Sequence, residues 1–582
     1  MDRLFRLQNV SMNPIWLILF LLVGCTSLGG CSKNLTGSVG TTPSSESPHP
    51  RTEPWFKNAD TKWRVDAINH AGPKDSFFMP RSMGNGAALL DADGDGRLDI
   101  FFLNSGQPGS GITNQLFLQL SPGRFQNCTA GSGVENSGIA CGVAVGDVDN
   151  DGRPDIFVSE YGGLKLFLNQ GGGRFQDRTL ESGLQADGWG ASASFFDFNR
   201  DGQLDIVLSQ YVSYSPDGHC YNKDGEREFC GPRRLDKAPA LLFRNDTLLR
   251  GSPRFTNVSK SSGLAGLPGP GLGVLCADFN GDGWDDIFIT NDQQANHLWI
   301  NQQDGTFVEE AVLRGVATDV IGATAANMGI AWGDVDGDGL DDLFVTHLRT
   351  EMHTLWKQGP PGQFTDATAK TGITQARRAT GFGTVFADFD LDGDLDLAWV
   401  NGRVQRGPVI DSPSVPEFWK AYAEPNDLLE NTGSGFFLSI ADANSAFCEP
   451  ANVARPLCAG DIDNDGDVDL VVGITDGRPA LLENTATRAG TWLSVKAIDG
   501  QANRDAYGAV IEVQAKKRRW RRLVQPGRSY LSSHDPRVFF GFGELSEIDA
   551  IVVRWPSGTL ERFDGGATNR HVVIKQGNGV PE

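Results

Sequence analysis

Seven copies of one nine-residue acidic loop carry the side chains of this chain that are best suited to chemistry. The first copy, DADGDGRLD at residues 91–99, places Asp at positions 1, 3, 5 and 9 and Gly at position 6. Oxygen ligands spaced in this way around a tight turn suit Ca²⁺, which takes roughly six to eight of them. Gly at position 6 permits the left-handed backbone that folds the chain around an ion. The spacing therefore predicts a calcium site in each loop.

The predicted metal ligands are the residues at positions 1, 3, 5 and 9 of loops 1 to 7, numbered in chain order. They are Asp91, Asp93, Asp95 and Asp99; Asp147, Asp149, Asp151 and Asp155; Asp197, Asn199, Asp201 and Asp205; Asp278, Asn280, Asp282 and Asp286; Asp334, Asp336, Asp338 and Asp342; Asp388, Asp390, Asp392 and Asp396; and Asp461, Asp463, Asp465 and Asp469. Loops 3 and 4 carry Asn at position 3, so we expect them to bind metal more weakly. An EF-hand would need an acidic residue at position 12, where this chain has apolar residues such as Phe102. We therefore expect up to seven structural Ca²⁺ ions in loops of another kind.

Short apolar segments flank every loop and must hold it in place. In the second unit, GVAVGD (142–147) precedes the loop, DIFVSE (155–160) follows it, and LFLN (166–169) comes next. A fourth segment has Phe with Gly eight residues later, as at Phe175 and Gly183. Four short strands per unit, without a helical period, are typical of a propeller blade, and so is a loop spacing of 50 to 81 residues.

The fold predicted from this pattern is all-β: a seven-bladed β-propeller with Ca²⁺-binding loops, followed by a small C-terminal β domain. Alternating segments such as WLSVKAI (492–498) and IVVRWPSG (551–558) mark the tail as β structure. The seventh unit lacks a fourth strand, and residues 62–70 resemble one, with Trp63 in the Phe position. We expect this upstream segment to complete the seventh blade and close the ring.

The N-terminus has the pattern of an export signal. Arg3 and Arg6 precede an apolar run at residues 14–23, which is too short to span a bilayer comfortably. The run leads into LVGC (22–25), which resembles the lipobox of bacterial lipoproteins, where the cysteine, here Cys25, carries the lipid. An ordinary secretory signal is the alternative. We expect an exported lipoprotein anchored to the outer membrane or cell surface, or otherwise a periplasmic or extracellular protein.

Composition divides the chain into four parts. Residues after the signal are rich in Ser, Thr, Pro and Gly, which is typical of a flexible tether. The predicted parts are the signal peptide 1–24, the tether 25–56, the propeller 57–490 and the C-terminal domain 491–577. Export also permits disulfides, and two pairs are close enough in sequence to bridge one loop each: Cys220 with Cys230, and Cys448 with Cys458.

The net charge of −22 has a local explanation. The seven loops hold 30 Asp residues, and seven divalent ions would add +14 to the net charge and leave −8. A balance of that size is ordinary for a protein surface, so the acidity does not require a basic partner. Nucleic acid is not an expected partner.

The repeated units resemble the FG-GAP/VCBS repeats of integrin α-subunit propellers, whose Ca²⁺ loops are structural and join the first two strands of a blade. Residues 60–577 as a whole resemble bacterial relatives of the cartilage acidic protein 1 family, in which a propeller precedes an ASPIC/UnbV domain. The resemblance places that domain at about Thr491–Gln576. Its matching motifs are NRDAYGA (503–509), SYLSS (529–533), VFFGFG (538–543) and VVRWPSG (552–558).

The expected function is that of a non-enzymatic adhesion or binding module with an unknown protein or carbohydrate ligand. No Ser/His/Asp or zinc-ligand spacing stands out, so no catalytic residue is assigned. The alternative is a propeller enzyme acting on polysaccharide, a lyase or hydrolase, with its catalytic groups on the face opposite the Ca²⁺ loops. A structural subunit that docks a neighbouring secreted protein is a third possibility.

Two further features are candidate contact sites. Insertions at 211–239 and 402–426 should emerge opposite the Ca²⁺ loops, and they contain Tyr211, Trp419 and Tyr422. Aromatic residues beside arginine suit ligand recognition, although the same loops could instead fill the channel or pack on the C-terminal domain. The basic run KKRRWRR (516–522) could meet an anionic polysaccharide, phosphate or lipid headgroup, but a solvated hairpin or pairing with the acidic propeller is favoured.

Overall fold

Strands are the main regular elements of the structure, and its α-helices are single turns of four or five residues. The computed structural model describes residues 53–73, 76–106, 109–248, 251–486 and 490–582. The predicted signal peptide, Cys25 and nearly all of the predicted tether lie outside the described residues. Within these ranges, no helix has the length and apolarity needed to cross a membrane. The predicted all-β fold is confirmed.

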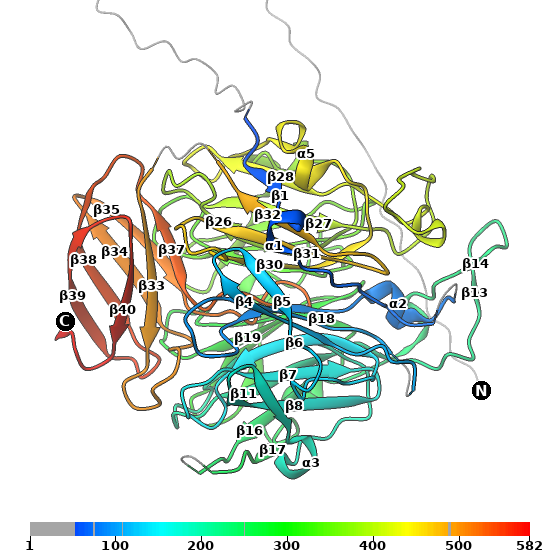
Figure 1. The fold of residues 1–582 in the computed structure, drawn as a ribbon, viewed down its shortest axis with the longest axis horizontal. Helices are drawn as coiled ribbons and strands as arrows, with labels where there is room; N and C mark the ends of the chain where they lie inside the picture. Colours follow the sequence, from blue (N-terminus) through cyan, green and yellow to red (C-terminus); the bar gives the residue numbers. More distant parts are fainter. Residues whose placement is uncertain (1–52, 74–75, 107–108, 249–250, 487–489) are drawn as a thin grey trace, which may run out of the picture. The chain divides into compact units, whose positions relative to one another are not determined.

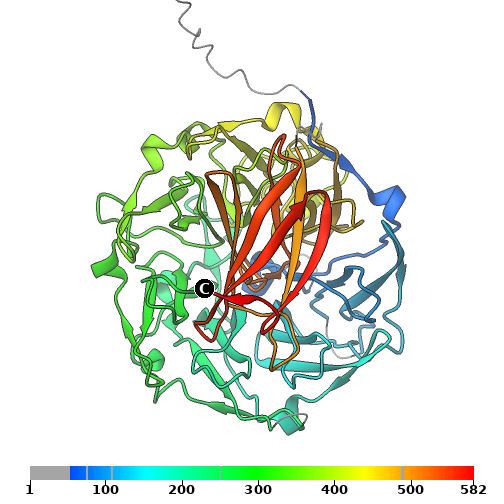
Figure 2. The same cartoon turned by 90° about the vertical axis from the view of Figure 1, so that its left-hand side faces the viewer.

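Seven antiparallel sheets repeat one four-stranded pattern in the described part of the chain, and we number them blade 1 to blade 7. Blades 1 to 3 comprise β2 (Ala87–Leu90), β3 (Asp99–Phe102), β4 (Gln115–Ser121) and β5 (Arg124–Asn127); β6 (Ala140–Gly146), β7 (Asp155–Glu160), β8 (Gly163–Gly171) and β9 (Arg174–Asp177); and β10 (Gly190–Phe196), β11 (Asp205–Gln210), β16 (Leu241–Asn245) and β17 (Phe255–Asn257). Figure 2 shows the sheets arranged around a ring, as in a propeller.

Blades 4 to 7 continue the pattern around the ring. They comprise β18 (Gly271–Ala277), β19 (Asp286–Asn291), β20 (His297–Asn301) and β21 (Phe307–Glu309); β22 (Ile330–Gly333), β23 (Asp342–Val345), β24 (Thr354–Gln358) and β25 (Phe364–Asp366); β26 (Gly381–Ala387), β27 (Asp396–Asn401), β28 (Asp427–Asn431) and β29 (Phe437–Ser439); and β30 (Ala454–Gly460), β31 (Asp469–Ile474), β32 (Ala480–Asn484) and β1 (Phe56–Asn58). Each acidic loop joins the first two strands of its blade, as predicted.

Small residues in the first strand allow neighbouring blades to approach closely. Every residue of β6 is buried. A Cβ atom on Gly142 would lie 2.2 Å from the carbonyl oxygen of Ala191 in the next blade. A side chain at this position would force the two strands apart, which explains the glycine five residues ahead of the acidic loop.

Blade 7 is closed by the N-terminal strand β1, which pairs with β32. In this pairing Phe56 lies opposite Asn484, just as Phe175 lies opposite Asn169 in blade 2. The prediction that residues 62–70 form the closing strand was therefore wrong. Trp63 instead ends the short helix α1 (Asp60–Trp63), where it is fully buried.

The remaining elements are short and lie between blade strands or in insertions. The helices are α2 (Met79–Met83), α3 (Thr179–Ser182), α4 (Ala311–Arg314) and α5 (Ser445–Cys448), with 3₁₀ turns at Pro232–Arg234, Leu264–Gly266, Thr368–Lys370, Ile373–Gln375, Glu417–Trp419 and Ala441–Ala443. The first insertion carries two small ribbons, β12 (Val212–Ser213) with β15 (Asp236–Lys237) and β13 (Cys220–Tyr221) with β14 (Arg227–Glu228).

The C-terminal domain consists of two sheets (Figure 1). One contains β33 (Trp492–Ile498), β37 (Val538–Gly541) and β40 (Arg570–Lys575), and the other contains β34 (Val510–Ala515), β35 (Arg518–Leu523), β38 (Glu547–Arg554), β39 (Leu560–Ala567) and β41 (Val580–Pro581). Strand β41 extends the second sheet beyond the predicted boundary at residue 577. One apolar core runs from this domain into blades 2 and 3.

Candidate metal loops and the domain that covers them

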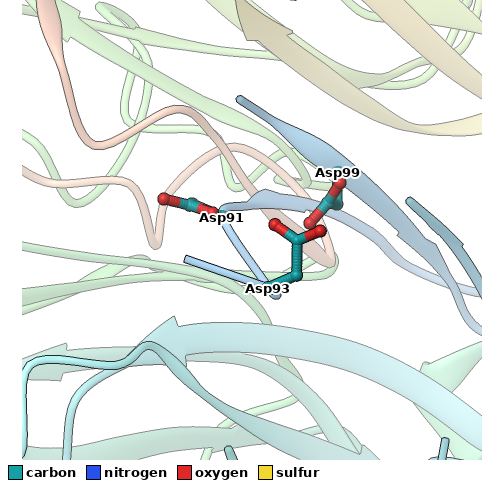
Figure 3. A group of neighbouring side chains, drawn as sticks. All are labelled: Asp91, Asp93 and Asp99. Atoms are coloured by element: carbon teal, nitrogen blue, oxygen red, sulfur yellow. The ribbon is translucent and has the colours of Figure 1, made fainter. Parts of the chain in front are cut away.

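Carboxylates of the acidic loops gather into groups that could hold a metal ion. In five loops, three Asp side chains each offer an oxygen, and these oxygens all lie within 4.8 Å of one another. The groups are Asp91, Asp93 and Asp99; Asp147, Asp149 and Asp155; Asp334, Asp336 and Asp342; Asp388, Asp390 and Asp396; and Asp461, Asp463 and Asp465. Figure 3 shows the first group at its loop. The groups bring together positions 1, 3 and 9 in four loops and positions 1, 3 and 5 in loop 7, while the other predicted ligands lie outside them.

The carboxylate at position 1 accepts hydrogen bonds from the backbone of its own loop. In loop 1, Asp91 Oδ1 accepts hydrogen bonds from the backbone nitrogens of Gly94 and Asp95 at 2.8 and 3.0 Å. Its Oδ2 accepts another from Gly96 at 2.9 Å. Gly96 has a φ of 86°, a conformation that L-residues rarely adopt. The loop is therefore preformed around the position that a cation would take.

The carboxylate at position 9 has a structural role that the motif alone did not indicate. Both oxygens of Asp99 accept backbone hydrogen bonds, Oδ2 from Ala92 at 2.8 Å and Oδ1 from Gln119 at 2.7 Å. The equivalent Asp makes the same two bonds in the other six loops. Position 9 therefore ties the acidic loop to the third strand of its own blade.

An amide near the end of the third strand ties six of the acidic loops to the next blade. Asn169 of blade 2 donates from Nδ2 to the carbonyl of Ala92 at position 2 of loop 1, at 3.0 Å. The same bond joins five further blade pairs, with donors Asn245, Asn301, Asn431, Asn484 and Gln119. The Gln119 bond to Ile462 joins blade 1 to blade 7 across the closure. The acidic loops are thus parts of a ring of contacts between blades.

Burial makes these carboxylates costly to ionise without a cation. It raises the pKa of Asp99, Asp147 and Asp461 to about 7 each, although backbone hydrogen bonds in the first two and Arg537 in the third act in the opposite direction. Asp388 Oδ1 and Asp463 Oδ1 are buried and accept no hydrogen bond among the described residues. A divalent cation would supply the missing partner and the opposing charge. The residues present therefore fit a metal of the kind that hard oxygen ligands prefer.

Loops 3 and 4 differ from the other five loops. Asn199 and Asn280 replace a carboxylate at position 3, and neither loop forms one of the five groups of three carboxylates. An arginine of the C-terminal domain approaches loop 4, because Arg554 Nη1 lies 3.1 Å from Asp278 Oδ2. In loop 3, burial raises the pKa of Asp197 to about 6, while the charge of Arg504 lowers it. Arginine charge thus offsets part of the acidity that a metal would otherwise balance.

The C-terminal domain covers the acidic loops with further arginines. Arg504 donates to Asn150 of loop 2 at 3.0 Å. Arg521 donates to the Gly339 carbonyl of loop 5 at 3.0 Å. Arg518 lies 3.3 Å from Asp394 of loop 6, and Arg537 donates to Asn464 of loop 7 at 2.7 Å. The basic run therefore pairs in part with the acidic propeller, as the favoured interpretation of the sequence held.

One segment of the C-terminal domain, residues 525–534, contacts the first strands of several blades, and we call it the plug. Its Ser532 and Ser533 form β36, which pairs with β2 of blade 1. Gly527 accepts from Ser194 of blade 3 at 2.8 Å, and Ser529 Oγ accepts from the backbone of Thr384 in blade 6 at 2.8 Å. The plug contains the SYLSS motif, and Tyr530 within it is fully buried. This motif therefore fills the centre of the ring.

Three of the insertion aromatics are buried and not available to a ligand, whereas Tyr221 is 61% exposed. Tyr211, Trp419 and Tyr422 are all at most 2% exposed. Phe229 of the first insertion stacks on Trp419 of the second with ring centroids 5.9 Å apart. The hydroxyl of Tyr422 donates to Glu228 across the same contact at 2.7 Å. The two insertions therefore pack on each other, an arrangement that the sequence did not indicate.

One of the two predicted disulfides is present. Cys220 and Cys230 are bonded and close the ribbon β13–β14. Cys448 and Cys458 are free and buried, so the second pairing was wrong. Cys448 lies in helix α5, whereas Cys458 lies in the first strand of blade 7 and donates to the carbonyl of Ala87 in blade 1. Closeness in sequence did not predict the directions of these two side chains.

Family comparisons match both parts of the chain. The family described as FG-GAP-like repeat matches residues 91–158, 147–208, 278–345 and 334–399. The family described as ASPIC and UnbV matches residues 499–581. Cartilage acidic protein 1 of Xenopus tropicalis is 25% identical over 498 residues, covering 82% of this chain and 61% of that protein. The human protein of the same name is 28% identical over 519 residues, covering 85% of this chain and 62% of its own length.

The chain thus spans about three fifths of the length of these curated relatives. Solved structures resemble it more distantly. A lectin from Agrocybe aegerita that recognises non-reducing terminal N-acetylglucosamine has 15% identity and a TM-score of 0.36, covering 69% of this chain and 94% of the lectin. A rhamnogalacturonan lyase from Bacillus licheniformis has 12% identity and a TM-score of 0.29, covering 85% of this chain and 91% of the lyase.

Proposed function

This chain is an FG-GAP repeat protein of the cartilage acidic protein 1 type with an ASPIC/UnbV domain, and from that premise we propose an exported, calcium-stabilised binding module without catalytic activity. The observation that carries the proposal is that a group of three carboxylates recurs in five blades, each time in the loop between the first two strands. Metal sites repeated in this way stabilise a scaffold, whereas a catalytic centre would occur once. The ions would be structural, with up to seven bound and the five complete groups bound most tightly.

Calcium is favoured over magnesium by the ligand set. Ca²⁺ accepts many oxygen ligands in flexible geometry, whereas Mg²⁺ needs a small octahedral shell and keeps several waters. Each loop offers side-chain oxygens at positions 1, 3, 5 and 9 and the backbone carbonyl at position 7. A calcium ion would neutralise the carboxylates of Asp388 and Asp461, which are almost fully buried.

Polar groups on the face opposite the loops support a non-catalytic role. The buried hydroxyl of Tyr211 donates to Asp292 at 2.5 Å, and that of Tyr422 donates to Glu228. Burial comes first among the causes that raise the pKa of both tyrosines. These acid–hydroxyl pairs are closed to solvent by the packing of the insertions, so they are poorly placed to reach a polysaccharide.

Export as a lipoprotein belongs to the same proposal and is supported by the LVGC pattern at Cys25. In a host that lipidates such signals, the Cys25→Ser variant should lose incorporation of labelled palmitate and leave the membrane fraction. Palmitate incorporation unchanged by this substitution would exclude Cys25 as the anchor.

Chelation tests the calcium proposal directly. With free Ca²⁺ at a hundredfold excess over Kd, each site stabilises the fold by about 2.7 kcal/mol. EDTA should therefore lower the Tm by on the order of 10 °C in differential scanning calorimetry, and Ca²⁺ should restore it. Mg²⁺ at the same concentration is the control and should restore little. A melting curve that EDTA leaves unchanged would contradict the proposal.

A further inference from the structure

The hairpin of β34 and β35 borders a polar cavity above loops 5 and 6. The cavity has a volume of about 480 Å³, which falls within the range of small-ligand sites. Five cationic side chains of this one hairpin line it: Lys517, Arg518, Arg519, Arg521 and Arg522. Such a concentration of positive charge is unusual in a chain with a net charge of −22.

Docking of the C-terminal domain uses only some of these cations. Arg521 holds loop 5 through the Gly339 carbonyl and lies 3.3 Å from Asp341. Arg518 reaches Asp394 at 3.3 Å, yet its side chain is 55% exposed. Arg519 is 70% exposed, and its ion pair with Glu512 lies within its own hairpin. Lys517 is exposed and forms no ion pair within the described ranges of the chain. Lys517 and Arg519 therefore do not contribute to docking.

A buried guanidinium also lines the cavity. Arg522 donates from Nη1 to the Arg521 carbonyl at 2.8 Å, but its buried Nη2 has no hydrogen-bond partner among the described residues. A buried N–H group without an acceptor is costly, and an acceptor entering the cavity would remove that cost. The lining of the cavity thus includes one guanidinium with an unmatched donor, Arg522, and two exposed cations, Lys517 and Arg519.

Four carboxylates share the cavity, and two of them belong to loop 5. The four are Asp334, Asp338, Asp394 and Glu512. The five cations exceed the four carboxylates by one charge, and calcium in loop 5 would offset Asp334 and Asp338 and raise the net charge of the lining from +1 to +3. The inference below therefore rests on the calcium loading proposed above.

We propose that this cavity, which we call the hairpin site, binds an anionic polysaccharide through its sulfate or carboxylate groups. Planar guanidinium groups bind such oxyanions through paired hydrogen bonds, and Arg518, Arg519 and Arg522 supply them. A concave site holds a sugar segment with its charged groups pointing inward. A flat or convex basic face would instead suit a membrane surface.

The test compares two double variants that remove the same charge. Lys517→Ala with Arg519→Ala removes the exposed cations of the hairpin site. Arg254→Ala with Lys260→Ala removes one exposed Arg and one exposed Lys from blade 3 and is the control. The probes are a heparin-derived tetrasaccharide, which is sulfated, and tetragalacturonate, which is carboxylated. Binding is measured by isothermal titration calorimetry on the full chain in Ca²⁺, and the EDTA melt is recorded on the same samples.

We expect the wild type to bind at least one probe and the hairpin variant to bind it about tenfold more weakly. The control variant should change the affinity by less than about twofold. The difference between the two probes then identifies the sulfated or the carboxylated class as the source.

Three outcomes would overturn the proposal. They are no binding of either probe, an equal loss of binding in the control variant, and hairpin-dependent binding to phosphatidylglycerol vesicles without binding of a tetrasaccharide. The EDTA melt separates the two proposals. If EDTA lowers the Tm but neither probe binds, only the hairpin-site proposal is contradicted. If EDTA leaves the Tm unchanged, the calcium proposal is contradicted as well.

Discussion

At the residue scale, positions 3 and 9 of the acidic loop have different roles. Asp155 at position 9 of loop 2 uses both carboxylate oxygens to hold backbone N–H groups of Val148 and Asn169, and it also offers an oxygen to the metal group. The carboxylate of Asp149 at position 3 accepts a hydrogen bond from the Asp151 backbone, within the same loop. Position 9 therefore serves the fold, and position 3 would serve the metal of the proposed calcium site.

Two substitutions in loop 2 separate these roles. Asp155→Ala should cost roughly 2–4 kcal/mol of unfolding free energy even in EDTA, because two buried N–H groups lose their acceptor. Asp149→Asn should change the stability in EDTA by less than about 0.5 kcal/mol but should reduce the gain from Ca²⁺. Urea unfolding of both variants with and without Ca²⁺ checks this. A loss below about 0.5 kcal/mol for Asp155→Ala in EDTA would show that position 9 acts as a metal ligand alone.

At the element scale, strand β1 closes the ring although it has only three residues. Phe56 is 1% exposed and packs on Phe389 and Phe447, with ring centroids 5.3 and 6.1 Å away. It occupies the place in blade 7 that the fourth-strand Phe occupies in the other blades. The closure of blade 7 thus depends on one buried aromatic ring and on the pairing of three-residue β1 with β32.

Phe56→Ala should lower the unfolding free energy by roughly 3–5 kcal/mol, the usual cost of deleting a buried ring. Lys57→Ala is the matched control. The Lys57 side chain lies next to Phe56 in β1 but is exposed, so its removal should change the unfolding free energy little. Chemical denaturation should keep a single transition in both variants, since all blades share the ring of contacts. An early, separate transition in the Phe56 variant would show that blade 7 melts independently.

At this scale, the sequence predicts those elements whose pattern lies within one repeat unit. The acidic loop and its flanking apolar strands repeat within each unit, so their elements and the all-β fold could be predicted. The closing strand could not, because Phe-Lys-Asn has no pattern of its own and Trp63 imitates the expected aromatic position. Packing of the two insertions through Phe229 and Trp419 depends on residues nearly 200 positions apart, which no local pattern records.

At the scale of the whole molecule, the C-terminal domain and the metal loops form one electrostatic system. Arginines of that domain touch loops 2, 4, 5, 6 and 7, so the charge state of the loops affects docking as well as folding. The basic run at 516–522 indicated part of this arrangement, but no pattern marked Arg504, Arg537 or Arg554. The motif positions were visible, but their partners lie in the other domain.

The pH dependence of stability should change sign with calcium. In EDTA, Asp99, Asp147 and Asp461 have a pKa of about 7 in the folded chain, above the value of about 4 expected when unfolded. The folded state then holds more protons between these values, so its stability should fall as pH rises from about 4 to 7. In saturating Ca²⁺ the ionised carboxylates bind metal and protons compete, so stability should fall as pH decreases over the same range.

Urea midpoints at pH 5 and pH 7 in EDTA and in Ca²⁺ measure both slopes. The EDTA sample should be more stable at pH 5, and the Ca²⁺ sample at pH 7. Slopes of the same sign in both conditions would mean that the loop carboxylates do not control the pH response.

The plug also relates the structure to the order in which the chain is made. Strand β1 is among the first described residues to be synthesised, but its partner β32 comes more than 400 residues later. The plug follows β32, so every blade is already synthesised before the segment that fills their centre exists. A chain that ends before residue 525 can complete its ring but not its interior. Burial of Tyr530 at the centre of the ring therefore requires synthesis to have passed residue 530, after the strands of all seven blades exist.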